Sequence, residues 1–207
     1  MPASSTIGRL TQAERVQRAR NGLLDAAAEL VIEQGYHATT AAAIAARAAL
    51  SREMVRVRFG SKLGLMRELL VTEYQQAFEE LPPGASAIDR LRGSVDQLAA
   101  MSTKAPTRLR AAFVLGFEAS TSVPELRDDL VPWLDEIESR FAELLQGAVT
   151  ERSIREIDAN DYARLLVATA TGGAFLYMTS PNTASDPAAP LRTIIDSLIL
   201  TDPGATS

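Results

Sequence analysis

Apolar residues recur at every third or fourth position along most of this 207-residue chain, and this spacing constrains the fold more than any other feature. It is typical of amphipathic α-helices, whereas the alternating pattern of half-buried strands is nearly absent. Proline, glycine and capping residues divide the pattern into segments. The sequence therefore predicts an all-α protein of about nine helices, at 12–34, 41–48, 52–58, 62–80, 86–101, 106–120, 124–150, 160–179 and 189–200.

The composition excludes several classes of protein. The chain has no cysteine, which excludes disulfides, thiolate metal sites and cysteine nucleophiles. His37 is the only histidine, so we expect neither a multi-histidine metal site nor a histidine-based triad. No apolar run approaches the roughly 20 residues that span a bilayer, and Met1–Thr6 lack the apolar segment of a signal peptide. We expect a cytoplasmic protein that is not an enzyme and has no metal, cofactor or membrane contact.

The charges are divided unevenly along the chain. The net charge of −5 by itself argues against a nucleic-acid partner. Residues 1–66 nevertheless contain nine lysines and arginines against five acidic residues, a local charge of +4, and the remaining 141 residues carry −9. Such asymmetry is expected when only one end of a protein meets a polyanion. A chance imbalance on a solvated surface is the other explanation.

Residues 39–62 contain two short helical segments joined by a tight turn. Thr39 and Thr40 precede an alanine-rich segment, and Ser51 begins the next segment after the turn at 48–50. Hydroxyl residues are preferred at helix N-caps. The alanines permit close helix–helix approach, and four apolar residues are spaced to share a small core, namely Ile44, Leu50, Val55 and Phe59. This is the construction of a helix-turn-helix, which presents its second helix to the DNA major groove.

The second of these helices supplies most of the candidate DNA contacts. An arginine can pair with both acceptors of a guanine edge or grip a phosphate. The helix N-terminus at Thr40 offers free amides to a phosphate, and Lys62 can contact the same DNA backbone. The basic stretch Arg9–Arg20 is either a further phosphate contact or a solvated extension, and an arginine-rich helix on an ordinary bundle remains the alternative. The predicted DNA-binding residues are Thr40, Ser51, Arg52, Glu53, Arg56, Val57, Arg58 and Lys62.

A specific combination of residues runs through the N-terminal third of the chain. It begins with Leu23–Leu30 and Glu33–Tyr36, and continues at Thr39, Thr40, Ile44, Ala45, Ser51, Phe59, Ser61, Lys62 and Leu65. In this combination residues 18–70 resemble the TetR family of bacterial transcriptional regulators. The resemblance implies a homodimer with an N-terminal DNA-binding domain and a larger helical domain that binds an inducer and dimerises.

Four positions depart from the family pattern. Ala49 stands in the turn where the family usually has glycine, and an alanine forced to positive φ costs on the order of 1 kcal/mol. Glu53 replaces a small residue, Arg56 a tyrosine and Arg58 a histidine. The two arginines preserve or raise the positive charge, so DNA binding is still expected, but the operator sequence does not follow from the resemblance. Glu53 either accepts from a cytosine amine or pairs with an arginine of its own helix.

Residues 86–150 carry many of the larger side chains. At helical spacing such side chains form either packed core or the wall of an apolar cavity with a few polar anchors. The family resemblance, rather than this pattern, implies a pocket for an unidentified small-molecule effector. The candidate pocket residues are Met101, Arg110, Phe113, Phe117, Glu118 and Trp133.

The last two helices are candidates for a dimer interface. Residues 162–178 have almost no charge, and each of the paired glycines at 172 and 173 costs about 1 kcal/mol relative to alanine in mid-helix, a cost usually tied to close packing. Two helices from each of two chains would form a four-helix interface and hold two recognition helices about 34–36 Å apart. Burial inside one chain is the alternative. The candidate interface residues are Gly172, Gly173, Phe175, Leu176, Leu191, Ile194, Ile195 and Leu198.

These observations predict a basic tail at 1–12, a helix-turn-helix domain at 13–62, a helical ligand-binding and dimerisation domain at 63–201, and a second tail at 202–207. The predicted function is that of a ligand-responsive transcriptional regulator, a repressor released from a double-stranded DNA operator by its effector. A helical module that binds a small molecule or a partner without binding DNA is the alternative.

Overall fold

The computed structural model describes residues 11–75, 84–104, 106–179 and 186–200. Within these residues the protein forms nine helices, and the only β pairing is an isolated bridge between Ile154 and Ile199. The helices are α1 (Gln12–Ala38), α2 (Ala41–Arg47), α3 (Arg52–Phe59), α4 (Lys62–Gln75), α5 (Ala87–Lys104), α6 (Pro106–Thr121), α7 (Pro124–Thr150), α8 (Ala159–Thr179) and α9 (Ala189–Leu198). The predicted all-α fold is confirmed. No helix in this described part of the chain is long and apolar enough to cross a membrane.

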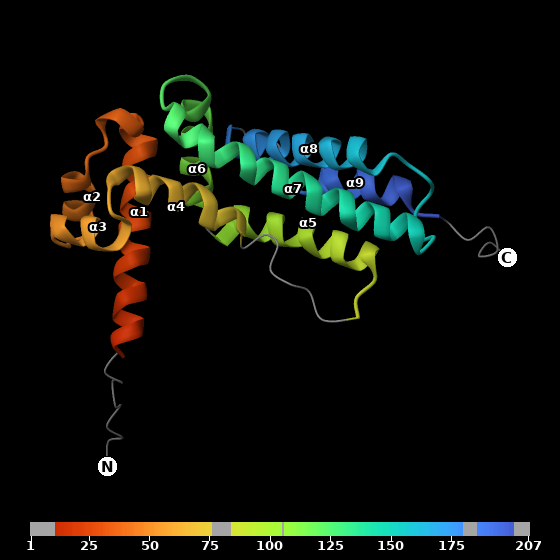
Figure 1. The fold of residues 1–207 in the computed structure, drawn as a ribbon, viewed down its shortest axis with the longest axis horizontal. Coiled ribbons are helices and arrows are strands. Elements are labelled where there is room, and N and C mark those ends of the chain that lie inside the picture. The colour runs from red at the N-terminus through yellow and green to blue at the C-terminus, as the bar shows by residue number, and fades with distance from the viewer. Residues whose placement is uncertain (1–10, 76–83, 105, 180–185, 201–207) are drawn as a thin grey trace, which may run out of the picture.

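Helices α1, α2 and α3 form the head, which lies at one end of the molecule (Figure 1). Ile44 of α2 and Val55 of α3 are at most 1% exposed, and both pack against the apolar face of α1. Leu50 and Phe59 are half-buried and pack against the same core. The small shared core expected of these residues therefore forms, and the predicted helix-turn-helix is confirmed.

The turn between α2 and α3 is a Schellman motif with alanine in the glycine position. The N–H of Leu50 donates to the carbonyl of Ala45 at 2.8 Å, and the N–H of Ala49 donates to the carbonyl of Ala46 at 3.1 Å. This pair of bonds requires a left-handed residue after the helix cap, and Ala49 has φ +54°. The strained turn expected from this alanine is present.

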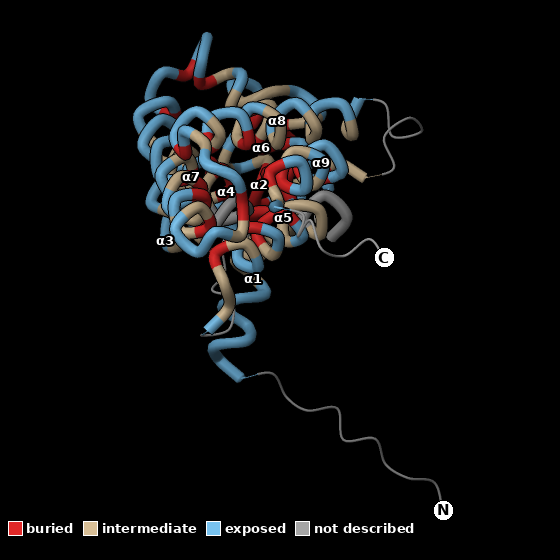
Figure 2. Tube along the Cα trace, turned by 90° about the vertical axis from the view of Figure 1, so that its right-hand side faces the viewer, coloured by how far each residue is buried: buried red, intermediate tan, exposed pale blue. Residues whose placement is uncertain are grey.

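Helix α1 has a regular part and an irregular end. Its regular conformation stops at Gly35, where φ is +77°, and a last irregular turn continues to Ala38. At the other end, Thr11 and Glu14 form a capping box in which each side chain bonds the backbone of the other residue. The first turns of α1 are exposed and extend away from the rest of the molecule (Figure 2).

Helices α4 to α9 form the body, which has two apolar cores. The first core is continuous with that of the head, because Leu65 and Leu69 of α4 and Leu115 of α6 pack together with the buried face of α1. The second core lies among α5, α7, α8 and α9, around Leu91 and Phe141. Apolar packing therefore continues across position 62, where the sequence predicted a domain boundary, and the head is coupled to α4 and α6 by shared core.

Candidate nucleic-acid interface and ligand cavity

Helix α3 presents a charged outer face. Arg52, Glu53, Arg56 and Val57 are exposed, and 66% of the Val57 surface is accessible. Val55 lies among them in sequence but is buried in the head core. Because Val55 anchors the inner side of the helix, with Met54 and Phe59 packed against the same core, the opposite face points to solvent. The structure thus gathers four of the predicted DNA-binding residues on the free face of α3.

Glu53 and Arg56 pair within that face. Arg56 Nε donates to Glu53 Oε1 at 2.9 Å, and Nη2 donates to the same oxygen. This hydrogen bonding raises the pKa of Arg56. Of the two roles open to Glu53, the structure contains the intrahelical pair. Nη1 of Arg56 has no hydrogen-bond partner among the described residues, so one edge of the guanidinium stays available.

The other predicted DNA-binding residues differ in how they are placed. Thr40 is exposed, and its hydroxyl caps α2 by accepting from the N–H of Ala43 at 3.1 Å. Ser51 occupies the N-cap position of α3 and is exposed, but its side chain makes no capping bond. Arg58 is half-buried on the flank of the helix, and its Nε is buried without a hydrogen-bond partner.

Lys62 points into the protein rather than along α3. Its Nζ donates to the backbone carbonyl of Tyr36 at 3.0 Å and lies 3.8 Å from the centroid of the Tyr36 ring. Burial lowers the pKa of Lys62, and the nearby Glu118 carboxylate opposes that shift. The structure therefore assigns Lys62 a contact between α4 and α1 that the sequence did not predict.

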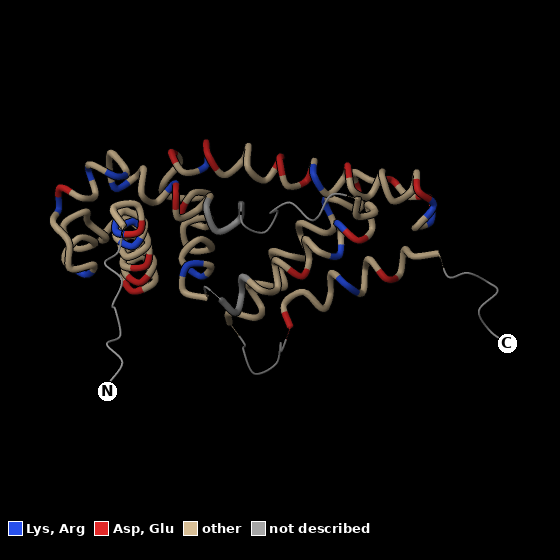
Figure 3. Tube along the Cα trace, turned by 90° about the horizontal axis from the view of Figure 1, so that it is seen from below, with Lys and Arg blue, Asp and Glu red and all other residues tan. Residues whose placement is uncertain are grey.

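Several other cations of the head are neutralised by ion pairs. Arg47 binds the carboxylates of Glu29 and Glu33 at 3.1 and 2.8 Å, and Arg20 binds Glu68 at 2.6 Å. Within the part of the chain that the structure covers, no ion pair forms at Arg52, nor at Arg15 and Arg18 on the exposed first turns of α1. Figure 3 shows several basic positions at the head end of the molecule. The positive charge of the head is thus concentrated on α3 and the start of α1.

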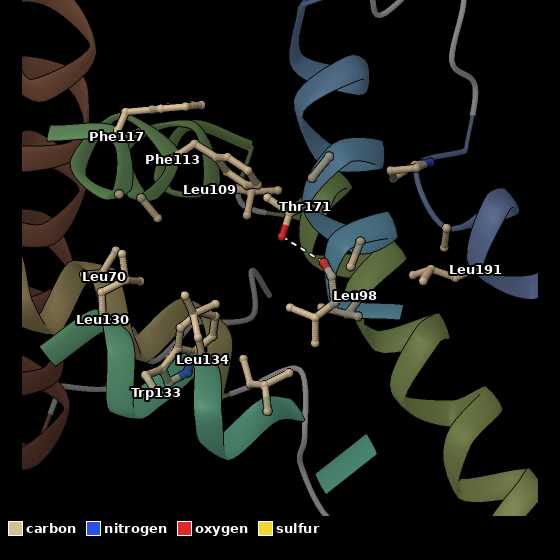
Figure 4. A pocket seen from close by; sticks show the side chains of 18 of the residues that line it. Leu70, Leu98, Leu109, Phe113, Phe117, Leu130, Trp133, Leu134, Thr171 and Leu191 are labelled. Atoms are coloured by element: carbon tan, nitrogen blue, oxygen red, sulfur yellow. Dashed lines mark hydrogen bonds between the residues drawn. The ribbon is translucent and has the colours of Figure 1, made fainter. Parts of the chain in front are cut away.

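The body contains an apolar cavity of about 310 Å³ that is partly open to solvent. Side chains from six helices line it, including Leu70 of α4, Leu98 of α5 and Leu191 of α9 (Figure 4). No charged side chain is among the lining residues that the structure describes. The polar side chains on the wall are those of Ser120, Trp133 and Thr171, and the Thr171 hydroxyl donates to the carbonyl of Val167 at 2.9 Å.

Three of the six predicted pocket residues line this cavity, namely Phe113, Phe117 and Trp133. Arg110 is exposed and not on the wall, which corrects that prediction. Glu118 is also absent from the wall because its carboxylate is turned toward α1. The side chain of Met101 lies outside the described residues. The wall residues that we did not predict come from all six helices. Three of these helices, α4, α8 and α9, held no candidate at all, and no local signal marks their wall residues.

The predicted dimer residues divide between solvent and core. Gly172, Phe175 and Leu176 of α8 are exposed, and the Leu176 side chain is 59% accessible. A Cβ on Gly172 would meet no atom within 4 Å, whereas one on Gly173 would lie 2.7 Å from the carbonyl oxygen of Pro187. Gly173 therefore serves packing within the chain.

Helix α9 corrects the prediction for its apolar residues. Leu191, Ile195 and Leu198 are each 1% exposed, in the core shared with α5, α7 and α8, and Ile194 is half-buried against the same core. The apolar stripe of α9 is thus the inner face of the helix, and Thr193, Asp196 and Ser197 form part of its polar outer face. Leu191, Ile195 and Leu198 are therefore buried inside their own chain, which was the alternative to a dimer interface.

A head with an outward-facing arginine-rich second helix and a body with an apolar cavity define a helix-turn-helix protein with a potential ligand site. Residues 23–69 match the family model described as bacterial regulatory proteins, tetR family. No curated protein matches the chain.

Solved structures of this fold match over nearly the whole chain. A putative TetR-family transcriptional regulator from Rhodococcus sp. has a TM-score of 0.74 and 22% identity, over 87% of this chain and 98% of that one. The SmeT–triclosan complex has a TM-score of 0.68 and 21% identity, over 91% and 94% of the two chains. A putative transcriptional regulator from Saccharomonospora viridis in complex with choline has a TM-score of 0.70 and 20% identity, over 89% and 100%.

The family match covers the helix-turn-helix segment at residues 23–69, and the described helices have the fold of TetR-family regulators. The resemblance seen in the sequence is confirmed.

Proposed function

We propose that this protein is a homodimeric repressor that binds double-stranded DNA through α3 and leaves the DNA when an uncharged, apolar molecule occupies the cavity. The observation that carries the proposal is the exposed pair Arg52 and Arg56, held outward by the buried Val55. A rigidly anchored helix with exposed guanidiniums has the size and the charge to enter a major groove.

The face of α3 offers two kinds of base contact. The unpaired edge of the Arg56 guanidinium suits a guanine or a phosphate, and the exposed methyl groups of Val57 suit a thymine methyl. The first turn of α2, capped by Thr40, presents backbone N–H groups that suit a phosphate. With Glu53 bound to Arg56, its carboxylate acts mainly by orienting the guanidinium.

The outer face of α8 supports dimerisation. Leu165, Phe175 and Leu176 are 44–59% exposed along this helix, and Gly172 leaves room between them for a second backbone. A self-complementary apolar stripe of this kind is typical of a two-fold interface. The proposed interface therefore consists of α8, with only the polar outer face of α9 beside it.

The chemistry of the cavity supports an uncharged effector. Burying a charge without a partner is costly, and the described part of the wall carries no carboxylate for a cation and no guanidinium or ammonium for an anion. Among proteins of this fold, one was solved with triclosan and one with choline. The wall of this chain suits a triclosan-like aromatic rather than a quaternary ammonium ion. Release from DNA requires that the effector bind the DNA-free conformation more tightly.

DNA binding is tested by selecting sequences from a random double-stranded library with the full chain. Measuring the affinity of the selected DNA for Arg56→Ala should show a loss of about tenfold or more and a shallower salt dependence. Arg127→Ala removes an exposed arginine from α7 in the body and is the matched control. A folded wild-type protein that enriches no sequence would contradict the proposal.

The interface is tested by sedimentation equilibrium. Leu176→Glu should shift the dimer to monomer, whereas Thr193→Glu, on the exposed face of α9, should leave the dimer intact. Dissociation by the α9 variant alone, or a monomeric wild type, would contradict the proposed interface.

Ligand choice is tested by isothermal titration calorimetry with triclosan and with choline. We expect heat of binding for triclosan and none for choline. The selected DNA should then be released by triclosan and not by choline. Binding of choline in preference to triclosan would overturn the proposed ligand class while leaving the DNA-binding result untouched.

A further inference from the structure

A carboxylate on α6 reaches the backbone of the head. The N–H of Tyr36 donates to both oxygens of Glu118, each at 3.1 Å. The two residues lie 82 positions apart in the sequence, and the contact is partly buried. Hydrogen bonds from a backbone N–H to an ionised carboxylate are among the stronger ones in proteins.

The carbonyl group of Tyr36 is held by a side chain of α4. The carbonyl oxygen accepts from Lys62 Nζ at 3.0 Å and from the N–H of Thr39 at 3.2 Å. Thr39 is completely buried, and Thr40, which follows it, caps α2. Because Lys62 begins α4 directly after α3, the contacts at Tyr36 lie at both ends of the helix-turn-helix.

Gly35 makes this contact sterically feasible. Its φ of +77° turns the chain at the end of the regular part of α1, and a Cβ at this position would lie 2.9 Å from Glu118 Oε1. The glycine therefore has two separate reasons to be there, the left-handed backbone and the close approach of a carboxylate. The sequence indicated only that a helix stops at this residue.

Helix α6 carries the cavity on one face and the head on another. Phe113, Gly116, Phe117 and Ser120 line the cavity and recur at helical spacing. Leu115 and Glu118 lie on the face toward α1. Phe117 and Glu118 are consecutive residues, so a shift or rotation of α6 that moves Phe117 must also move the Glu118 carboxylate.

We infer that Glu118 is the positioning residue that holds the DNA-binding head against the body, and that a molecule entering the cavity weakens DNA binding by drawing Glu118 away from the Tyr36 N–H. The inference rests on the proposed function, because it concerns how occupancy of the proposed ligand site reaches the proposed DNA-binding site. It adds a named residue and a named hydrogen bond to that function.

The first test compares three full-length proteins on the selected DNA in the absence of any ligand. Glu118→Gln removes the charge and one of the two acceptor oxygens. We expect its affinity for DNA to fall about tenfold, or about 1.4 kcal/mol. Its affinity for a cavity ligand in the absence of DNA should rise, because the ligand no longer has to break the contact. Glu143→Gln, an exposed carboxylate on α7, is the matched control and should bind DNA as the wild type does. Equal DNA affinity for Glu118→Gln and wild type would overturn the inference.

A second variant approaches the same contact from the other partner. Gly35→Ala places a methyl group against the Glu118 carboxylate and should weaken DNA binding in the same direction. Combined with Glu118→Gln, it should cost less than the two single effects added together, because both changes remove one contact. Full additivity would show that Gly35 acts on the head independently of Glu118 and would contradict the shared contact.

Amide hydrogen exchange at Tyr36 tests the contact without any DNA. The Tyr36 N–H should exchange slowly in the wild type and at least tenfold faster in Glu118→Gln. Saturation of the wild type with biphenyl, an uncharged aromatic hydrocarbon, should also accelerate exchange. Acceleration in the variant together with no change on biphenyl binding would refute the transmission step, and no change in either would refute the contact.

These readouts separate the inference from the function on which it rests. If the wild type and the Glu118→Gln variant both bind DNA equally well and release it with ligand, only the proposed role of Glu118 is refuted. A wild type that binds no DNA sinks the proposed function, and the exchange rate at Tyr36 still decides whether Glu118 holds the head.

Discussion

In the head, Leu23, Ile44 and Val55 are at most 1% exposed and belong to one packed core. The charged side chains lie outside this core. In the body, helices of similar apolar character leave about 310 Å³ unfilled between them. The same kind of sequence thus builds a fully packed region and a hollow one. A packed core holds the arginines of α3 in fixed positions, whereas a hollow core can accommodate a second molecule by moving its walls.

The largest expected effect compares equivalent truncations in the two regions. Ile44→Ala should lower the free energy of unfolding by about 3 kcal/mol, because it opens a void in a filled core. Leu134→Ala, on the wall of the cavity, should cost only about 1–2 kcal/mol, since part of its side chain already faces empty space. Urea denaturation of both variants measures the difference. Equal costs would show that the cavity closes in solution.

Enlarging an alanine in each region should change stability in opposite directions. Ala45→Leu overfills the head and should destabilise it by about 1–3 kcal/mol. Ala170→Leu extends into the cavity and should be neutral or stabilise by up to about 1 kcal/mol, while it weakens binding of an aromatic ligand at least tenfold. Thermal unfolding and calorimetric titration give the two values. A destabilised Ala170→Leu with unaltered ligand affinity would contradict this account of the body.

The smallest effect concerns the turn of the head. Ala49→Gly relieves the positive φ but makes the unfolded chain more flexible, so we expect a net stabilisation of about 0.5 kcal/mol. The melting temperature should rise slightly, and the affinity of the cavity for an aromatic ligand should not change. Ala46→Gly, in the last turn of α2, is the control and should destabilise by up to about 1 kcal/mol. A lower melting temperature for Ala49→Gly would mean that the strain is negligible.

The sequence was most informative where the determining signals are local. Proline at the first positions of α6 and α7, the caps at Thr40 and Ser51, and the break at Gly35 set the helix ends to within a few residues of those in the structure. The helix-turn-helix was predictable for the same reason, because its turn and its small core lie within one short stretch of chain.

The sequence was least informative where two distant segments meet. Glu118 is a plausible pocket anchor in the sequence, yet it bonds a backbone group 82 positions away. An amphipathic helix shows that one face is buried but not what buries it, which is why the apolar stripe of α9 was assigned to a partner chain and lies in the core of its own. Gly172 and Gly173 are adjacent and look alike, but only Gly173 is pressed against Pro187.

Trp133 is the single tryptophan of the chain, and it stands on the cavity wall. Excitation at the long-wavelength edge of protein absorption therefore produces fluorescence from the Trp133 indole alone. The wavelength of maximum emission distinguishes a hydrated cavity from one that a ligand has dried, so Trp133 is an intrinsic fluorescent reporter of occupancy. Libraries of unlabelled compounds can be screened on the unmodified chain by that signal alone.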